Sequence, residues 1–273
     1  MLSNRSQDGW FASAFTVLEL TFHCSVRSVR RSHGNAVLGL LMNIIQTVML
    51  VGVFYGLYVV VGFSAGGIRG DFMLYLMTGV FLFMSHVKAV SAVFQSEGPT
   101  SAMMKHAPMN TIVAIGAAAV GELYIQVLSM LVVLFLYHAA WQPLEIYDPL
   151  GALLMLLLSW FSGVAIGMIF LAMKPWAPNF AGLLAQIYSR ANMVFSGKMF
   201  VANSMPSLLL PYFSWNPLFH TIDQARGFAF LNYTPNYTSV VYPVGLAFSL
   251  LLIGLMGEFY TRRRASISWG AKH

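Results

Sequence analysis

Charge and cysteine are scarce in this sequence. Only 9% of the 273 residues are charged, and Cys24 is the single cysteine. So few charges cannot cover the surface of a water-soluble protein of this length. One cysteine excludes an internal disulfide framework and a thiolate-rich metal site.

Motifs for nucleotide, metal and nucleophile chemistry are also missing. No Gly-x-x-x-x-Gly-Lys-Ser/Thr loop occurs, so the chain is not expected to cradle nucleotide phosphates itself. The seven histidines are scattered without metal-ligand spacing, and no Ser-His-Asp or paired-carboxylate arrangement stands out. We therefore expect no enzyme, no catalytic residues, no bound cofactor and no metal site in this chain.

Apolar runs long enough to cross a bilayer fill most of the sequence. Hydrophobic residues make up 58% of it, and the mean hydropathy is +0.70. A crossing helix needs roughly 20 mainly apolar residues. The predicted spans are residues 36–61, 72–94, 111–140, 149–173, 175–194 and 239–257. The sequence therefore predicts one all-α integral membrane domain over residues 1–273, with six transmembrane helices.

Basic residues fall mainly on one side of these spans. Six crossings place both termini on the same side, and most of the 15 Lys and Arg residues fall there. The exceptions are Arg69, Arg190, Lys198 and Arg226. Because basic residues beside short loops stay in the cytoplasm, we expect both termini to be cytoplasmic. The basic residues on this side, which attract anionic lipid, account for most of the net charge of +6. The charge therefore does not imply a nucleic-acid partner.

Aromatic and aliphatic residues recur at helical spacing before the first span. They are Trp10, Phe11, Phe15, Leu18, Phe22 and Val26. Polar and basic residues lie between them, which predicts an amphipathic helix over residues 7–27 in the membrane interface. The alternative is a frayed tail.

A polar stretch, residues 97–108, separates the second and third spans on the cytoplasmic side. Pro99 and Pro108 bracket a turn or two of possible helix. Local features leave two interpretations open. The stretch is either a solvated loop or a short docking helix whose Met103 and Met104 offer deformable contacts to a cytosolic partner.

Short apolar pieces broken by Pro and Ser occupy residues 195–228, after the fifth span. They predict half-helices that enter the membrane from the outer side and return. Asn216 and Pro217 are a favourable helix start, and the helix would place His220 and Arg226 near one face. Irregular backbone at membrane depth must be buried in protein or line a cavity. The segment is therefore the candidate outer gate, formed by Phe200, Pro206, Trp215, Asn216, Pro217, His220 and Arg226. His220 is expected to be hydrogen-bonded rather than a metal ligand.

Two charged residues, Glu122 and Arg190, fall inside predicted spans. An unpaired ion there costs on the order of a few kcal/mol. Either the two side chains pair or face water, or Arg190 binds the phosphate of a lipid-linked substrate.

The order of these segments resembles the permease subunit of type 2 ABC exporters, and it is most similar to those that export capsular polysaccharide or lipopolysaccharide O-antigen. The most specific part of the likeness is Trp215-Asn216-Pro217-Leu218-Phe219-His220 followed by Arg226. The resemblance implies a homodimer in the bacterial inner membrane. It also implies a separate ATPase that binds ATP and Mg²⁺, and a glycan or glycolipid substrate that passes between the two permease copies.

The same resemblance assigns roles to particular residues. It implies that residues 97–108 are a coupling helix inserted into a cleft of the ATPase, with contacts from Glu97, Met103, Met104, Lys105 and Pro108. It implies a pair of outer gate helices over residues 195–211 and 216–228. One alternative is a type 2 permease for a drug or a small lipid. An alternative from another class is a stand-alone channel or secondary carrier, which would show an inverted repeat that we do not find here.

Overall fold

The computed structural model describes residues 36–61, 70–96 and 111–270, together with Glu19, Thr21, Cys24 and Ser25. In these ranges every regular element is a helix. The four isolated residues are helical, and the rest of the predicted interfacial helix, residues 7–27, lies outside the described residues. The predicted coupling helix, residues 97–108, also lies outside them.

Five helices of the described ranges are long and apolar enough to cross a bilayer. They are α2 (Ala36–Val61), α3 (Phe72–Gln95), α5 (Thr111–Ala140), α6 (Pro149–Met173) and α10 (Val241–Gly270). Helices α2, α5 and α6 have the predicted bounds, and α3 is one residue longer. Helix α10 continues past its predicted end at residue 257, and its apolar part covers residues 241–261. The prediction of an all-α integral membrane protein is confirmed.

The fifth predicted span forms a shorter and more polar helix. Helix α7 covers Pro178–Phe195, which is 18 residues, instead of residues 175–194. Proline has no amide hydrogen and therefore suits the first turn of a helix, and Pro178 occupies that place. Helix α7 packs against α3 and α6, but it is not among the helices apolar enough to cross a bilayer. The six predicted crossings thus become five apolar helices and one amphipathic helix.

Helices α3 and α6 form the centre of the bundle. The apolar stretches of α3 and α6 are 78% and 61% buried, against 33% or less in α2, α5 and α10. Two glycines of α6 allow the backbones to meet. A Cβ on Gly163 would lie 2.4 Å from the carbonyl oxygen of His86, and one on Gly167 would lie 2.9 Å from that of Val90. Because they are four residues apart, both glycines face α3.

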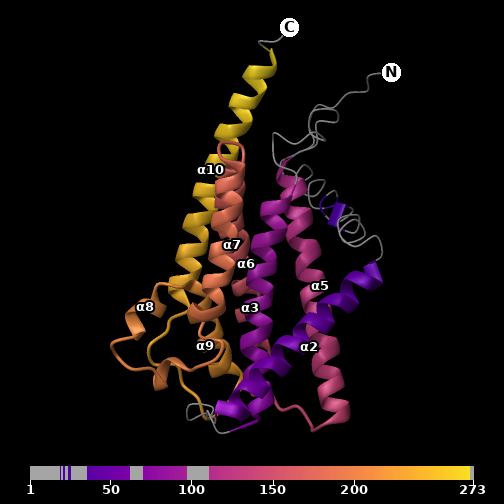
Figure 1. The fold of residues 1–273 in the computed structure, drawn as a ribbon, viewed down its shortest axis with the longest axis vertical. Helices are drawn as coiled ribbons and strands as arrows, with labels where there is room; N and C mark the ends of the chain where they lie inside the picture. The colour runs from indigo at the N-terminus through magenta and orange to yellow at the C-terminus, as the bar shows by residue number, and fades with distance from the viewer. Residues whose placement is uncertain are drawn as a thin grey trace.

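Two short helices, α8 (Leu210–Ser214) and α9 (Pro217–Ala229), close one end of the bundle. Figure 1 shows them at the end opposite to the C-terminal end of α10. Helix α9 contacts α3, α6 and α10. The segment between α7 and α10 is therefore packed into the end of the bundle, and we call it the end segment (residues 196–240).

Candidate functional site

The end segment begins with a tight turn and continues in short pieces. Gly197 has a positive φ of 70°, a conformation that glycine adopts without strain, and a Cβ there would lie 2.4 Å from the Phe219 ring. A 3-10 turn, η1 (Ala202–Ser204), and α8 follow. The expected first gate helix over residues 195–211 is therefore a turn and two short pieces. The second expected helix, residues 216–228, corresponds to α9.

Asn216 joins the start of α9 to the end of α7. Its side-chain oxygen accepts a hydrogen bond from the Leu218 amide at 3.0 Å, which caps the helix. Its Nδ2 donates to the Asn192 side chain at 2.8 Å and to the Phe195 carbonyl at 2.9 Å. Pro217 fills the first helical position, where no amide hydrogen is needed. The Asn-Pro pair therefore fixes both the start of α9 and its position against α7.

Arg226, at the other end of α9, holds the turn after α7. Its side chain is fully buried and donates to the carbonyl oxygens of Gly197, Phe200 and Lys198 at 3.0, 2.7 and 2.6 Å. The guanidinium carbon lies 4.1 Å from the centre of the Tyr75 ring on α3. The turn is thus attached to α3 through one arginine, whose planar group can serve several acceptors at once.

His220 links α9 to the chain on both of its sides. Its Nε2 lies 2.7 Å from the Ser214 carbonyl, and its Nδ1 accepts from the Ser239 amide at 3.0 Å. A carbonyl requires a donor and an amide requires an acceptor, so the ring is neutral with its proton on Nε2. Burial lowers the pKa of His220 in agreement with this.

Asp223 fastens the same helix to the loop that follows it. The carboxylate is buried and accepts from the Ala202 amide, the Tyr233 hydroxyl and the Thr238 hydroxyl at 3.2, 2.6 and 2.8 Å. These bonds satisfy the charge inside the protein. Helix α9 is therefore the buried core of the end segment, and the other pieces are tied to it.

The remaining expected gate residues lie further out. Trp215 is 56% exposed, and its carbonyl accepts from the Tyr242 hydroxyl at 2.6 Å. Pro206 is exposed, while the Phe200 ring packs edge-on against Phe213 with centroids 5.3 Å apart. The structure thus gathers Asn216, Pro217, His220 and Arg226 in one buried helix and leaves Trp215 and Pro206 on its surface.

Lys198 is buried, a feature that the sequence analysis missed. Its ammonium lies 3.6 Å from the centre of the Phe83 ring and 5.0 Å from that of Phe54, with no hydrogen-bond partner. Burial lowers the pKa of this lysine to about 7. The sequence placed Lys198 only among the basic residues of the outer side. The neighbouring Gly197, which turns the chain inward, is the one local signal of its direction.

Glu122 and Arg190 do not meet. Glu122 accepts from the Gln126 side chain at 2.7 Å, and Gln126 also donates to Asn43 of α2 at 3.1 Å. Asn43 in turn donates to the Ser129 hydroxyl at 2.9 Å. We call these four polar residues the α2–α5 seam: Asn43, Glu122, Gln126 and Ser129. Arg190 lies on α7 with its side chain exposed.

A second buried polar cluster connects α7 to the centre of the bundle. The Nε2 of His86 on α3 lies 2.7 Å from the Tyr188 hydroxyl on α7. Its Nδ1 lies 3.0 Å from both the Ser159 carbonyl and the Ser162 hydroxyl of α6. The buried face of α7 is therefore fixed by hydrogen bonds as well as by packing.

The opposite face of α7 is exposed and partly polar. Asn179, Gln186 and Arg190 are exposed and lie on one face, since they are seven and four residues apart on a helix of 3.6 residues per turn. Buried positions such as Ala181 and Ala185 lie on the other face. We call Asn179, Gln186 and Arg190 the polar stripe of α7. The stripe leads along the helix toward the end segment.

The comparison with known families fits this architecture. The model of the ABC-2 type transporter family matches residues 19–230, which include α2 to α9. The chain belongs to this family. An ABC-2 permease is the transmembrane component of an ABC transporter and works with a partner ATPase. The membership favours an ATP-dependent transporter subunit over the stand-alone channel or carrier that the sequence left open. No curated protein matches the chain.

A pH experiment tests the role of His220 in this ABC-2 permease. Because the pKa of His220 is lowered in the folded state, the unfolded chain binds more protons as the pH falls below the ordinary histidine value of 6.5. The contribution of His220 to stability is therefore full above pH 6.5 and decreases at lower pH. We expect the Tm of the purified chain to fall between pH 7.5 and 5.5, and to fall less in His220→Gln. An equal fall in both proteins would contradict this role.

Proposed function

We propose that this ABC-2 permease is the membrane subunit of an exporter that moves a polysaccharide or lipid-linked glycan out of the cytoplasm across the bacterial inner membrane. Two copies of the chain form the path, and a separate ATPase binds ATP and Mg²⁺. The polar stripe of α7 is the single observation that carries the proposal.

The polar stripe needs a polar environment. An Arg side chain that faces lipid at membrane depth costs on the order of a few kcal/mol. Arg190 is exposed in the single chain and has no partner among the described residues. Two copies that place their α7 helices face to face would enclose Asn179, Gln186 and Arg190 in a common path. This requirement supports the proposed homodimer.

The chemistry of the stripe favours an anionic, hydroxyl-rich cargo. A guanidinium binds phosphate through two parallel hydrogen bonds, and a lipid-linked glycan carries phosphate between lipid and sugar. Asn and Gln side chains donate to and accept from hydroxyl groups. Beyond the stripe, Tyr212 and Trp215 of the end segment are 65% and 56% exposed, and exposed aromatic rings can stack on sugar rings.

The end segment would act as the outer gate. It lies at the end of α7 toward which the stripe leads, and α9 anchors it through Asn216 and Arg226. The side chains of Pro206 and Trp215 are exposed on the surface of the end segment. The Phe200 ring packs against Phe213 of α8.

Coupling to the ATPase is assigned to the other end of the bundle. Residues 97–108 connect α3 to α5 there, with Glu97, Met103, Met104, Lys105 and Pro108 as the contacts to the ATPase. Helix α3 leads directly from that connection into the centre of the bundle. Both chain termini would lie on the same, cytoplasmic side.

Reconstitution of the complex tests the proposed cargo. The chain is co-purified with its partner ABC ATPase and placed in liposomes. We expect ATP hydrolysis to be stimulated by a phosphate-linked lipid oligosaccharide, and not by a hydrophobic drug or a short-chain lipid. Stimulation by the drug or lipid alone would support the alternative cargo and reject the glycan. Failure to bind any ATPase would reject the exporter itself.

Arg190 provides a sharper test of the anionic cargo. A hydrogen bond to a charged group contributes about 1.5–3 kcal/mol, so Arg190→Gln is expected to raise the half-stimulating cargo concentration by about ten-fold or more. Arg190→Lys should keep part of the affinity because it keeps the charge. Lys88→Gln, which removes one positive charge from α3 near Gln46, is the control and should leave the concentration unchanged. Equal effects of Arg190→Gln and Lys88→Gln would reject a specific role for Arg190.

A further inference from the structure

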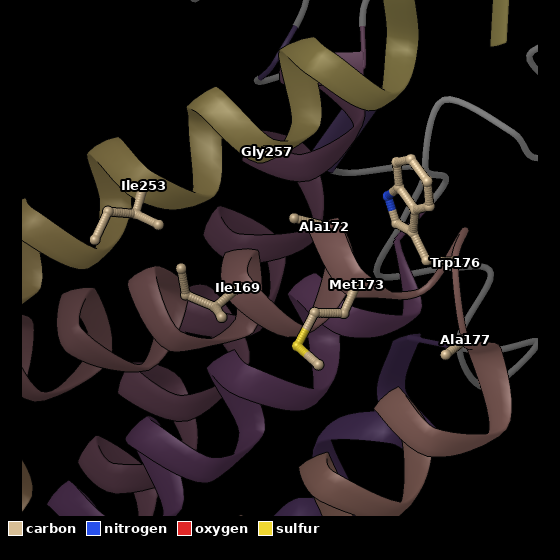
Figure 2. Close-up of a pocket in the computed structure, with 7 residues that line it drawn as sticks. All are labelled: Ile169, Ala172, Met173, Trp176, Ala177, Ile253 and Gly257. Carbon is tan, nitrogen blue, oxygen red and sulfur yellow. The ribbon is translucent and has the colours of Figure 1, made fainter. Parts of the chain in front are cut away.

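A groove lies between α6 and α10 at the end of the bundle away from the end segment. It has a volume of about 340 Å³, and its lining is almost entirely apolar. Figure 2 shows Ile253 of α10 and Ile169 of α6 on facing sides of this space, with Trp176 at one side. Met173 also lines the groove. Ala172, Ala177 and Gly257 complete the lining. The groove is separate from the polar stripe of α7 and from the end segment.

The packing of small residues explains why the groove is there. A Cβ on Gly254 would lie 2.6 Å from the Cβ of Met168, and one on Gly257 would lie 2.9 Å from that of Ala172. The two helices are therefore in close contact up to this level. Helix α6 then ends at Met173 and the chain turns toward α7, while α10 continues. Beyond Met173, α6 no longer packs against α10, so the face of α10 that was turned toward α6 is exposed.

The rim of the groove carries aromatic residues typical of a membrane interface. The Trp176 ring stacks on Tyr260 with centroids 6.2 Å apart and planes at 12°. Its indole nitrogen lies 3.4 Å from the Thr261 hydroxyl. Tryptophan and tyrosine prefer the level of the lipid headgroups, and the apolar part of α10 ends at Thr261. The groove therefore opens just below the headgroup level.

Positive charge follows immediately beyond the rim. Arg262, Arg263 and Arg264 continue α10 directly after Thr261. Lys174 does not add to this charge, because its ammonium donates to the Phe94 carbonyl of α3 at 3.1 Å. The only acidic residue of α10, Glu258, is buried and does not line the groove. An apolar slot below a run of three arginines is complementary to an amphiphile with a hydrocarbon tail and a negative headgroup.

We propose that this groove binds an anionic phospholipid from the leaflet on the side of the C terminus of α10. One acyl chain lies between Ile169, Met173 and Ile253, and the phosphate lies at the level of α10 just beyond Thr261, where the sequence has three arginines in a row. The bound lipid covers the wall of α10 that α6 leaves open. The proposal does not depend on the cargo of the transporter.

Lipid retention tests the acyl site. The full chain is purified from membranes containing phosphatidylglycerol and phosphatidylcholine, and the lipids that stay bound are counted by native mass spectrometry. Ile253 lines the groove and is exposed, so Ile253→Phe should fill the groove without disturbing the core. Leu252→Phe is the matched control, since Leu252 is similarly exposed, at 62% against 58%, but does not line the groove. We expect Ile253→Phe to lose the retained lipid and Leu252→Phe to keep it. Equal retention in the two variants would overturn the site.

The headgroup is tested with the three arginines. Each basic residue near a membrane surface contributes about 1 kcal/mol, or about five-fold in affinity, toward anionic lipid. The variant with Arg262, Arg263 and Arg264 replaced by Gln should therefore retain lipid but lose its preference for phosphatidylglycerol over phosphatidylcholine. An unchanged preference would overturn the headgroup assignment. Binding of phosphatidylcholine alone by the unaltered chain would overturn the proposal of an anionic lipid.

Discussion

Replacing Arg226 by Gln is expected to unfold the end segment. The guanidinium is the only described side chain that donates to all three carbonyl oxygens of Gly197, Lys198 and Phe200. The Gly197 carbonyl would keep the Phe200 amide as a donor at 3.3 Å, but the Lys198 and Phe200 carbonyls would lose theirs. Each buried acceptor left without a donor costs about 1–3 kcal/mol. For a chain of this size we expect the Tm of the purified protein to fall by about 5–10 °C. The same loss should release the turn from Tyr75, so a cysteine at position 198 would become reactive toward a water-soluble maleimide.

Two variants separate geometry from charge in this test. Arg226→Lys keeps the positive charge, but one ammonium group cannot bond three carbonyls as the planar guanidinium does. We therefore expect Arg226→Lys to lower the Tm nearly as much as Arg226→Gln. Arg190→Gln removes an exposed arginine and should leave the Tm unchanged. If Arg226→Lys behaves like the unaltered chain, the positive charge and not the three hydrogen bonds holds the turn.

Gly163→Ala is expected to separate the two central helices. Its new Cβ would lie 2.4 Å from the carbonyl oxygen of His86, and a backbone atom cannot move aside as a flexible side chain can. Overpacking of this kind costs about 1–3 kcal/mol and shifts the backbone. The shift would also pull Ser159 and Ser162 away from His86, and thus weaken the attachment of Tyr188 on α7. We expect a lower Tm together with reduced ATP-dependent transport.

Gly245→Ala is the matched control. This glycine lies in helix α10, and no atom lies within 4 Å of the position of its missing Cβ. Alanine is the better helix former by about 1 kcal/mol, so the substitution should leave the Tm unchanged or raise it slightly. If both variants lower the Tm equally, the cause is the loss of glycine in a helix in general, and the close contact of α3 with α6 is not responsible.

The long helices were predictable because the bilayer sets their length. Mainly apolar runs of more than 20 residues begin at Phe72, Thr111 and Pro149, each after a loop or polar stretch, and the helices begin at the same residues. Helix α7 was harder to predict since it mixes Gln186 and Arg190 with apolar residues, so its face toward the bundle could not be told from its exposed face. The structure fixes that choice through Tyr188.

The start of α9 was equally visible in the sequence, because Asn216 and Pro217 act locally. The contacts of Arg226 and Asp223 were not, since their partners lie 10 to 29 residues away in the chain. The sequence left open whether Glu122 pairs with Arg190, since both are charges in apolar runs. The sequence gives no distances between possible partners. In the structure Glu122 accepts from Gln126, which also donates to Asn43.

The α2–α5 seam constrains how the permease can move. Only 28% of the apolar stretch of α2 is buried, so packing alone attaches it weakly. Asn43 nevertheless exchanges hydrogen bonds with Gln126 and Ser129 of α5. Hydrocarbon offers no water to replace those bonds. If α2 moves during the transport cycle, α5 must therefore move with it, and the two helices are expected to behave as one rigid unit.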